Sequence, residues 1–575
     1  MKKIFKKTTD KKKFEIFFLI FLFVIFIIFR LAKLKTAPRT IMIDEASHAY
    51  IAYSLFKTGR DEHGQSWPII FKAFGDQKLP AYAYTLIPFL AVLPLEPWVV
   101  RLPSVISGIL FVLVIFYLMQ ELKFTKKESI FAACIAAFSS WTFILSRFAY
   151  ESNLGLLFFT TALLFFLRAK HSKKNINYFF LAFFSALSVY SYISYRLIVP
   201  IFFLIILIFS YFKQTHCTLL KNKLFYSFII FLLLISPIFF LSNIDNNLAR
   251  FNQVGLLSDQ GMILEINEKR TFCSFNFPRL LCDFIFNKGT FLLKKVFSAY
   301  LLLFSPNYLF LEGDKNLTYM NVDGFGQFSF LLLPFYFSAI AFLFRVDLKK
   351  QEQSLKLFLI ISFLIAPLPA ALSGLQKVRL SPVLPFFLTF FTLGFREFLA
   401  FFKKNQIKKL VFLLVTLLLP FHFLLYFVNF VGVHLPKNIF AYDGYVPKIF
   451  SIGQDYIEKN KMVYIEAFFS DPIMYYAFYQ KIDPSYYQEK AKLAPLENSG
   501  FQHAIALDNY QVVHSLAEAL ELAEKSEREV VYITNKQVLN KKYLLENVWV
   551  SDPAIVYAQV YDLTKYILEE ENEKI

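Results

Sequence analysis

Cysteine is scarce in this chain of 575 residues, which contains only four. Four scattered cysteines form neither the disulfide framework of a small secreted domain nor a zinc site. Cys134 lies in an apolar run and Cys217 in a basic loop. Cys273 and Cys282 share one predicted outer loop, where they either pair or, as the default interpretation, stay free thiols.

Charged residues are also sparse, at 18% of the chain, whereas 57% of the residues are hydrophobic. A soluble domain cannot bury that much apolar surface, so the composition excludes an ordinary soluble fold. The formal net charge is +18. The positive charge sits in short clusters between apolar runs, which argues against a nucleic-acid partner. We find no internal repeat and no long low-complexity segment.

Apolar runs of near twenty residues predict an α-helical integral membrane protein with about eleven transmembrane helices. They are expected at 13–33, 99–121, 128–145, 152–169, 176–192, 196–212, 224–242, 326–345, 356–373, 380–400 and 408–430. The basic N-terminus reads as a signal anchor, because a cleaved signal peptide has a shorter core and a small-residue cleavage site. The basic loops fall consistently on one side of the predicted spans. We therefore expect a multi-pass protein of the plasma (cytoplasmic) membrane, with its N-terminus on the inner side and its C-terminus on the outer side.

Two domains follow from this pattern. Residues 1–430 form the transmembrane catalytic domain, and 431–575 form a small α/β domain outside, because strand-like "MVYIEAF" and "EVVYITN" alternate with helical "SLAEALELAEKSE". Two outer segments, 79–94 and 283–304, are apolar but short or basic. We expect interfacial helices there, with a further span as the alternative for 283–304.

A pair of adjacent carboxylates, Asp44 and Glu45, stands in "IMIDEASHAY" just after the first apolar run. Asp44 is a candidate general base, and the alternative is a helix cap, because Asp accepts hydrogen bonds from free N–H groups at a helix start. Glu45 is a candidate for orienting substrate or metal, against simple solvation. His48 and His63 lie nearby, but lone loop histidines without a second-ligand spacing are usually solvated.

Other outer loops bring further polar side chains close to the hydrocarbon, where charges usually pair or serve a site. Cations suit a phosphate, and we assign this role to Lys78, Arg147, Arg196 and Arg379. Substrate contacts are assigned to Asp76, Tyr82, Glu151 and Tyr192. The alternatives are a snorkelling lysine, a structural Arg147–Glu151 ion pair, and arginines that only anchor to headgroups. "GDKNLTY" (313–319) is a candidate lid or acceptor-binding loop.

This mixture suits glycosyl transfer from a sugar on polyprenyl phosphate, which needs one base and phosphate-binding cations. By analogy with inverting glycosidases, the base lies on the face opposite the leaving group. The alternative is a transporter or flippase of lipid-linked sugars, which predicts charges near the bilayer midplane and often two related halves. A third interpretation is an inactive protein that only binds polyprenyl phosphate.

The ordered segments "IDEASHAYIAYSLFKTGRDEHG", "FGDQKLPAYAY", "VRLPSVISG", "SRFAYESNLGLLFF", "YSYISYRLIVP", "LEGDKNLTY" and "RLSPVLPF" span roughly residues 1–400. In this order the chain resembles the GT-C class of membrane glycosyltransferases, in the phospholipid-carrier-dependent branch of protein O-mannosyltransferases and lipid A aminoarabinose transferases. The resemblance implies Asp44 as catalytic base and Lys78 as a contact to the donor phosphate. Glu151 stands where better-known relatives carry Asp, so the chain departs from the family pattern at this position.

The resemblance also bears on partners and cofactors. It implies a polyprenyl-phosphate sugar as donor and a protein, lipid or glycan hydroxyl as acceptor. No cofactor is certain; a divalent cation is possible, since some relatives bind one near the acidic pair and others need none. Fold alone does not choose the sugar or the acceptor.

Overall fold

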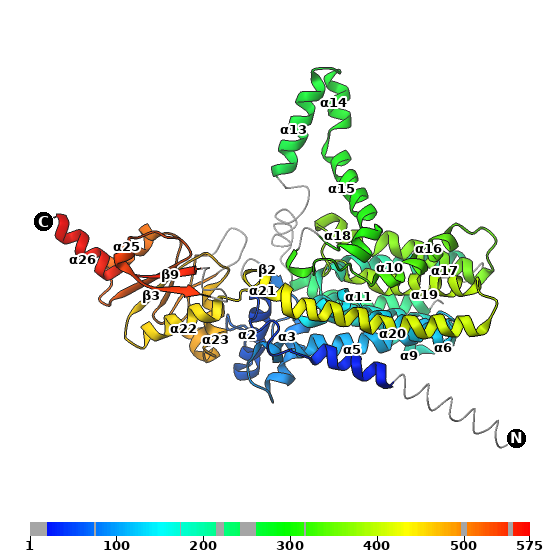
Figure 1. The fold of residues 1–575 in the computed structure, drawn as a ribbon, viewed down its shortest axis with the longest axis horizontal. Helices are drawn as coiled ribbons and strands as arrows, with labels where there is room; N and C mark the ends of the chain where they lie inside the picture. Colours follow the sequence, from blue (N-terminus) through cyan, green and yellow to red (C-terminus); the bar gives the residue numbers. More distant parts are fainter. Residues whose placement is uncertain are drawn as a thin grey trace. The chain divides into compact units, whose positions relative to one another are not determined.

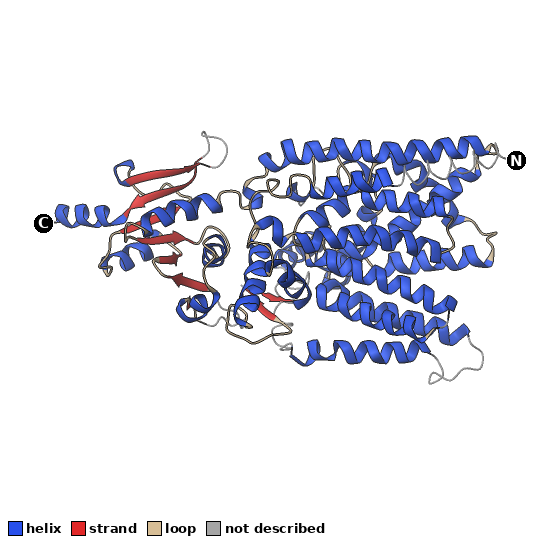
Figure 2. Cartoon of the chain, turned by 90° about the horizontal axis from the view of Figure 1, so that it is seen from below, coloured by secondary structure: helices blue, strands red, loops and turns tan. Residues whose placement is uncertain are grey.

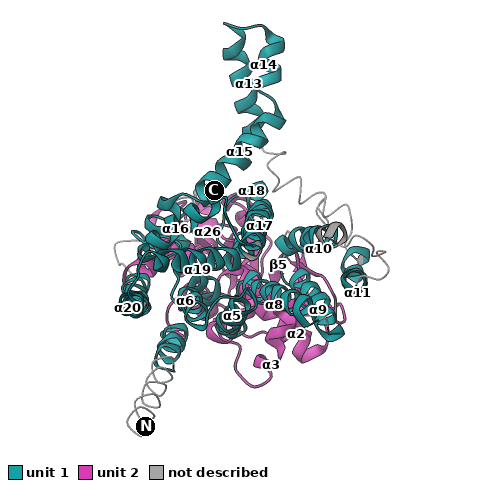
Figure 3. Ribbon diagram, turned by 90° about the vertical axis from the view of Figure 1, so that its right-hand side faces the viewer, with its two compact units in different colours: residues 1–33, 103–430 teal, residues 34–102, 431–575 magenta. Residues whose placement is uncertain are grey.

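Helices make up most of the chain (Figures 1 and 2). The computed structural model describes residues 20–73, 76–172, 174–213, 223–241, 260–314, 318–495, 503–549 and 556–574. The chain divides into two compact units, coloured separately in Figure 3. Unit 1 comprises residues 1–33 and 103–430, and unit 2 comprises 34–102 and 431–575. The segment 34–102, which contains Asp44, Glu45 and Lys78, thus belongs to the same compact unit as the C-terminal part of the chain.

Unit 1 is a helical bundle. Its longer helices are α5 (Leu102–Glu121), α6 (Lys126–Ala137), α7 (Ser140–Arg147), α8 (Glu151–Ser172), α9 (Asn175–Ser191), α10 (Ile193–Lys213), α11 (Lys223–Leu241), α16 (Leu333–Phe344), α17 (Lys350–Ile365), α18 (Leu368–Ser373), α19 (Leu384–Ala400) and α20 (Asn405–Asn429). Short helical turns are η2 (Asn307–Leu311), η3 (Thr318–Met320), η4 (Phe330–Leu332), η5 (Ser381–Val383) and η6 (Phe430–His434).

Six helices in the described residues are long and apolar enough to cross a membrane, or seven if α6 and α7, bent by 54°, form one span. Shorter apolar helices cover Ile20–Leu31, Ile193–Ile208 and Phe330–Phe344. In the described residues each predicted span overlaps one of these helices, except 176–192, which coincides with the 17-residue helix α9. Residues 13–19 of the first predicted span and residue 242 lie outside the described residues. The α-helical membrane fold is therefore confirmed. The number of full-length spans is below about eleven because several predicted segments form shorter helices in the described residues.

Close helix packing in unit 1 depends on a small residue. At Gly394 on α19 an added Cβ would lie 1.8 Å from the carbonyl oxygen of Phe335 on α16. Only glycine therefore allows α16 and α19 to approach this closely. At the end of α19, Arg396 donates to Glu128 of α6 at 3.0 Å, which ties a third helix to the pair.

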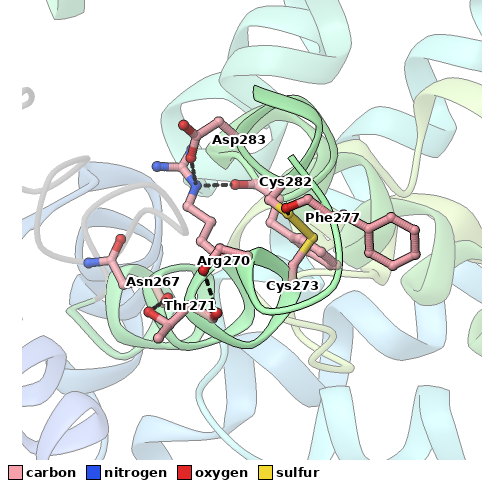
Figure 4. The surroundings of a disulfide bond; sticks show 9 residues. Asn267, Arg270, Thr271, Cys273, Phe277, Cys282 and Asp283 are labelled. Atoms are coloured by element: carbon pink, nitrogen blue, oxygen red, sulfur yellow. Dashed lines mark hydrogen bonds and ion pairs between the residues drawn. A yellow bond between two sulfur atoms is a disulfide. The ribbon is translucent and has the colours of Figure 1, made fainter. Parts of the chain in front are cut away.

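An arm of three helices belongs to unit 1: α13 (Gln260–Ser274), α14 (Arg279–Ile285) and α15 (Lys288–Leu303). A disulfide joins Cys273 to Cys282 at the turn between α13 and α14 (Figure 4). The default expectation of free thiols is therefore wrong for this pair, because the turn brings the two Cα atoms to 5.8 Å, a distance that a disulfide spans. Cys134 is free and buried, and Cys217 lies outside the described residues.

Unit 2 begins with α2 (Ile43–Thr58), a hairpin of β1 (Phe71–Ala73) and β2 (Asp76–Lys78), α3 (Pro80–Leu90) and α4 (Pro97–Val100). Its C-terminal helices are α21 (Leu435–Lys437), α22 (Val446–Ile457), α23 (Pro472–Tyr479), α24 (Pro484–Lys490), α25 (Leu516–Glu524) and α26 (Leu563–Lys574), with turns η7 (Phe440–Tyr442) and η8 (Lys541–Tyr543). Its C-terminal strands are β3 (Met462–Glu466), β4 (Lys492–Leu493), β5 (Ala504–Leu507), β6 (Tyr510–Val513), β7 (Val530–Thr534), β8 (Leu544–Trp549) and β9 (Val556–Asp562).

The seven C-terminal strands form one mixed sheet in the order β4-β5-β6-β3-β7-β9-β8. β3 lies between β6 and β7 and is parallel to both, whereas the outer pairs are antiparallel. All five residues of β7 are buried, as a strand covered on both faces requires. The predicted small α/β domain is therefore confirmed as a fold.

Candidate active site

The first turn of α2 carries the two carboxylates, but Asp44 does not cap the helix. Met42 occupies the N-cap position, and the Oε2 atom of Glu45 accepts the Met42 N–H at 3.2 Å. The carboxylate three residues into the helix thus closes the turn, as in a capping box. The two acidic side chains also complement the positive end of the helix dipole.

Asp44 faces a lysine from the β1–β2 hairpin. The Nζ atom of Lys78 lies 2.8 Å from Oδ1 of Asp44 and 3.2 Å from its carbonyl oxygen. The Lys78 side chain is 3% exposed, whereas that of Asp44 is 73% exposed. The structure therefore brings together two residues that the sequence analysis singled out, one an accessible carboxylate and the other a buried ammonium group.

Glu45 lies in a different environment, in a buried two-pronged pair with Arg101. Nε and Nη2 of Arg101 lie 2.9 and 2.8 Å from the two carboxylate oxygens, and both side chains are at most 1% exposed. The remaining donors of Arg101 bind the carbonyl oxygens of Pro38 and Thr40 at 2.7 and 2.6 Å. This arginine ties the segment before α2 to the helix itself.

Arg101 was missed by sequence reasoning. It stands in "WVVRLP" at the start of a predicted span, where a charge near the hydrocarbon calls for a partner. That partner lies 56 residues earlier, so no local pattern connects the two.

The acidic pair does not fit a metal site. Arg101 binds both carboxylate oxygens of Glu45, so a cation held by both carboxylates would have to displace Arg101. No group of three or more His, Cys, Asp or Glu residues that could hold a metal ion occurs in the described ranges. His48 is buried, with its ring 5.3 Å from that of Tyr82, and His63 Nε2 lies 3.0 Å from the carbonyl oxygen of Lys72.

The loop after α2 holds a residue that the sequence analysis did not single out. Glu62 is buried, and among the described residues no other side chain donates a hydrogen bond to its carboxylate oxygens. Burial, with the charge of Asp61 acting in the same direction, raises the pKa of Glu62 well above its usual range, while a hydrogen bond from its own backbone and the charge of Lys78 oppose the shift. Glu62 therefore favours the neutral acid form in this loop.

Asp76 and Tyr82, predicted as substrate contacts, also fall in unit 2. Asp76 pairs with Ala73 in the hairpin register, and its side chain lies outside the described part. Tyr82 is fully buried on α3 and donates its hydroxyl to the carbonyl oxygen of Val100 at 2.8 Å. In this arrangement Tyr82 supports α4, and its predicted contact with substrate stays a prediction.

The remaining predicted residues fall in unit 1. Arg147 ends α7, is 1% exposed and donates to the carbonyl oxygen of Ala32 at 2.9 Å. Glu151 begins α8, and Tyr192 caps the C-terminal end of α9. Arg196 lies in the first turn of α10, where no described residue accepts a hydrogen bond from its Nε atom.

Arg379 lies in the loop before η5 and donates to the carbonyl oxygen of Ser373. Its neighbour Lys377 is buried, and its Nζ donates to the carbonyl oxygen of Met320 at 2.8 Å. Burial lowers the pKa of Lys377 to about 7, against the opposing charge of Asp314. Arg147 and Arg379 thus donate to backbone carbonyl oxygens, and the neighbouring Lys377 is buried. In "GDKNLTY", residues 315–317 lie outside the described ranges.

The chain is similar to known proteins in both sequence and fold. Residues 77–240 match the family model described as "Dolichyl-phosphate-mannose-protein mannosyltransferase". The crystal structure of ArnT from Cupriavidus metallidurans bound to undecaprenyl phosphate has a similar fold, with a TM-score of 0.54 and 10% identity over 95% of this chain and 98% of that chain. The chain therefore has the fold of this structure, and its residues 77–240 are similar to the mannosyltransferase family. The matched range begins after the acidic pair, so it includes Lys78 and leaves out Asp44.

A second similarity is weaker. The oligosaccharyltransferase of Archaeoglobus fulgidus, tethered with an acceptor peptide containing the NVT sequon, aligns with a TM-score of 0.46 and 13% identity over 90% of this chain and 69% of that chain. Among curated proteins, none matches the chain.

Proposed function

We propose that this GT-C chain transfers a sugar from a polyprenyl-phosphate donor to an acceptor hydroxyl on the outer face of the membrane, with inversion, and that Asp44 is the general base. The observation that carries the proposal is the ion pair of Asp44 and Lys78 at 2.8 Å. It joins a carboxylate that is open to an acceptor with a cation suited to a phosphate.

The reaction is a single displacement. Asp44 accepts the proton of the acceptor hydroxyl while the oxygen of that hydroxyl attacks the anomeric carbon of the sugar. The bond from that carbon to the phosphate oxygen breaks, and its electron pair leaves with the polyprenyl phosphate. A phosphate is a good leaving group, so the step requires no general acid. Back-side attack inverts the anomeric configuration.

Lys78 has to change partners in this scheme. In a back-side displacement the base and the leaving phosphate lie on opposite faces of the sugar, so one ammonium group cannot hold both. We propose that the donor phosphate draws the Lys78 Nζ away from Asp44, which leaves the carboxylate to the acceptor hydroxyl. A side chain of four methylenes allows such a movement.

The orientation and the further cations are also proposals. The basic loops predicted on the inner side place the first turn of α2 outside. Arg147, Arg196 and Arg379 are proposed to contribute to the donor phosphate. The family description and the undecaprenyl phosphate in the ArnT crystal support a lipid-phosphate donor.

The test uses the purified full chain in detergent and a panel of polyprenyl-phosphate sugars, with and without an acceptor extract. Wild type is compared with Asp44→Asn, which keeps the size of the side chain and removes the base. The control is Asp562→Asn, because Asp562 accepts the Lys565 N–H at the start of α26, far along the chain from α2. We expect Asp44→Asn to lower kcat about 100- to 10,000-fold and the control to leave it unchanged.

The outcomes separate the alternatives. Equal turnover by wild type and Asp44→Asn would place the base elsewhere. Donor binding without turnover of any sugar would favour a flippase or a binding protein. Retention of the anomeric configuration in the product, read by NMR, would contradict the single displacement.

A further inference from the structure

We propose that Asp443 is a positioning residue for the base. In this proposal the C-terminal α/β domain, through Asp443, fixes the first turn of α2 and with it the direction of the Asp44 carboxylate. The inference rests on the proposed function and assigns a role to the C-terminal part of unit 2.

The observation is that three consecutive backbone N–H groups before and at the start of α2 are each bound by a side chain. Ile41 donates to the hydroxyl of Tyr479 at 3.3 Å, and Met42 donates to Glu45 at 3.2 Å. Ile43, the residue before Asp44, donates to the Asp443 carboxylate. Two of these three acceptors come from the C-terminal part of the chain. A helix start leaves such N–H groups without partners inside the helix, so these contacts decide how the first turn is held.

The Asp443 carboxylate is itself held in place. Tyr475 donates its hydroxyl to Oδ2 at 2.6 Å, and Tyr445 donates to Oδ1 at 3.3 Å. Burial raises the pKa of Asp443, the hydrogen bonds from Tyr475, Tyr445 and Ile43 oppose the shift, and the charge of Glu45 adds to it. The backbone of Asp443 is left-handed, with φ of 53°, a conformation that Asp and Asn adopt more readily than most residues. The Asp443 carboxylate is therefore an acceptor whose orientation is fixed by its neighbours, and not a solvated surface charge.

The same domain also holds the other end of α2. Nε2 of Gln488 on α24 lies 3.0 Å from Ser54 Oγ, 3.1 Å from Thr58 Oγ1 and 2.8 Å from the carbonyl oxygen of Asp61. Between the two ends, Tyr50 donates its hydroxyl to the carbonyl oxygen of Ile482 at 3.1 Å. The helix is thus attached to the C-terminal domain along its length, and Asp443 is the attachment next to the base.

A general base must lie within hydrogen-bond reach of the proton it accepts, and a displacement of about 1 Å costs about 100-fold in rate. Loss of the Asp443 contact would loosen the peptide that carries Asp44 without removing any group proposed to touch substrate. The effect should therefore fall on kcat more than on KM.

The experiment uses the full chain in detergent with Asp443→Ala, Asp443→Asn and the control Asp562→Ala, which removes an acidic helix cap from α26 instead. Asp443→Asn keeps the left-handed backbone accessible and so guards against a variant that fails to fold. Hydrogen exchange is followed on the peptide that contains residues 41–46. Turnover is measured against pH with whichever donor of the polyprenyl-phosphate panel the wild type uses.

We expect Asp443→Ala to exchange the N–H groups of 41–46 faster than wild type, Asp443→Asn to lie between the two because its amide oxygen still accepts a hydrogen bond, and the control to leave them unchanged. We expect Asp443→Ala to lower kcat at least about 10-fold with KM within about twofold. In Asp443→Asn the acidic limb of the kcat profile should move to lower pH, because a negative charge near the base is lost. A change in folded fraction alone would not move that limb.

Unchanged exchange at 41–46, or a kcat equal to that of the control, would overturn the positioning role. If Asp44→Asn keeps full activity, the proposed function fails first. If Asp44→Asn is inactive while the Asp443 variants behave like Asp562→Ala, the proposed function stands and only this inference fails. If no donor turns over, the exchange measurement alone decides whether Asp443 holds the turn.

Discussion

Asp44 and Glu45 are neighbours in sequence, yet they occupy opposite environments. Asp44 is 73% exposed beside a buried lysine, whereas Glu45 is 1% exposed and both of its oxygens bind Arg101. A buried charge that loses its partner costs several kcal/mol, whereas an exposed one costs little. Glu45 is therefore committed to holding the first turn of α2, whereas Asp44 remains available for chemistry.

The same contrast applies to the two cations. Arg101 binds two backbone carbonyl oxygens besides the two oxygens of Glu45. Its loss would remove a hydrogen-bond donor from all four acceptors. Lys78 has a single ammonium group on a flexible stem, which exchanges partners more readily than a planar guanidinium. Loss of the Glu45–Arg101 pair should therefore lower stability, whereas loss of the Asp44–Lys78 pair should mainly weaken binding of the donor.

Breaking the buried pair should have the largest effect on stability. Arg101→Leu leaves the Glu45 carboxylate buried without its partner, and we expect it to lower the free energy of unfolding by about 3–5 kcal/mol. Urea unfolding of the full chain in detergent measures the change. Adding Glu45→Gln, which neutralises the carboxylate and keeps an acceptor for the Met42 N–H, should restore part of the loss.

Arg345→Leu is the matched control, because Arg345 pairs with Glu397 at 2.8 Å and is 55% exposed. We expect it to cost no more than about 1 kcal/mol. An Arg101→Leu protein that is as stable as this control would contradict the structural role of the buried pair.

Breaking the Asp44–Lys78 pair should weaken binding of the donor more than it lowers the stability of the fold. Lys78→Met removes a charge-assisted contact, and we expect it to weaken binding of undecaprenyl phosphate about 10- to 100-fold. The free energy of unfolding should change by less than about 1 kcal/mol, because Asp44 is exposed to water once its partner is removed.

The control is Lys72→Met, an exposed lysine on the neighbouring strand of the same hairpin. Binding to the two variants and to wild type is compared by native mass spectrometry. A fall in stability without a fall in affinity for Lys78→Met would assign Lys78 to the fold and remove it from the donor site.

The limits of prediction follow from sequence separation. The helix carrying the acidic pair and the apolar spans are local patterns, and both were predictable from residues within about twenty positions. Arg101 and Asp443 are not local to the pair that they support, because they lie 56 and about 400 residues from it. The alternative interpretation of Asp44 as a helix cap is wrong for a local reason, because the N-cap position falls at Met42 and Glu45 closes the turn.

Burial is the second quantity that the sequence did not provide. Glu45 and Glu62 look as polar as Asp44 in the printed sequence, and only packing separates them. The disulfide of Cys273 and Cys282 is a similar case, since spacing permits the pair and only the geometry of the turn decides it.

A smaller effect is expected at the C-terminal end of α2. Gln488→Leu removes the amide that donates to Ser54, Thr58 and the carbonyl oxygen of Asp61, and we expect a loss of about 1–2 kcal/mol. Hydrogen exchange across residues 54–61 should rise locally, while that of 41–46 stays as in wild type. Glu489→Ala, on the same helix and exposed, is the control. Equal exchange in both variants would show that Gln488 does not hold this end.

The smallest effect concerns pH and sharpens the comparison of exposed with buried carboxylates. Burial raises the folded pKa of Glu62 well above its ordinary value of 4.5, so the folded chain binds this proton more tightly than the unfolded chain does. Its contribution to stability is complete below the unfolded pKa and is lost as pH rises from there through the folded pKa. Glu62→Gln does not titrate, so it should unfold at a higher temperature than wild type at pH 8, and the difference should shrink toward pH 4. Glu546→Gln makes the same change in charge at an exposed position on β8 and should show no such trend. A difference that is flat with pH would mean that Glu62 has the same pKa in the folded and the unfolded chain and would contradict the burial effect. A trend of opposite sign, with wild type gaining stability relative to Glu62→Gln as pH rises, would mean that Glu62 is ionised and paired in the folded chain.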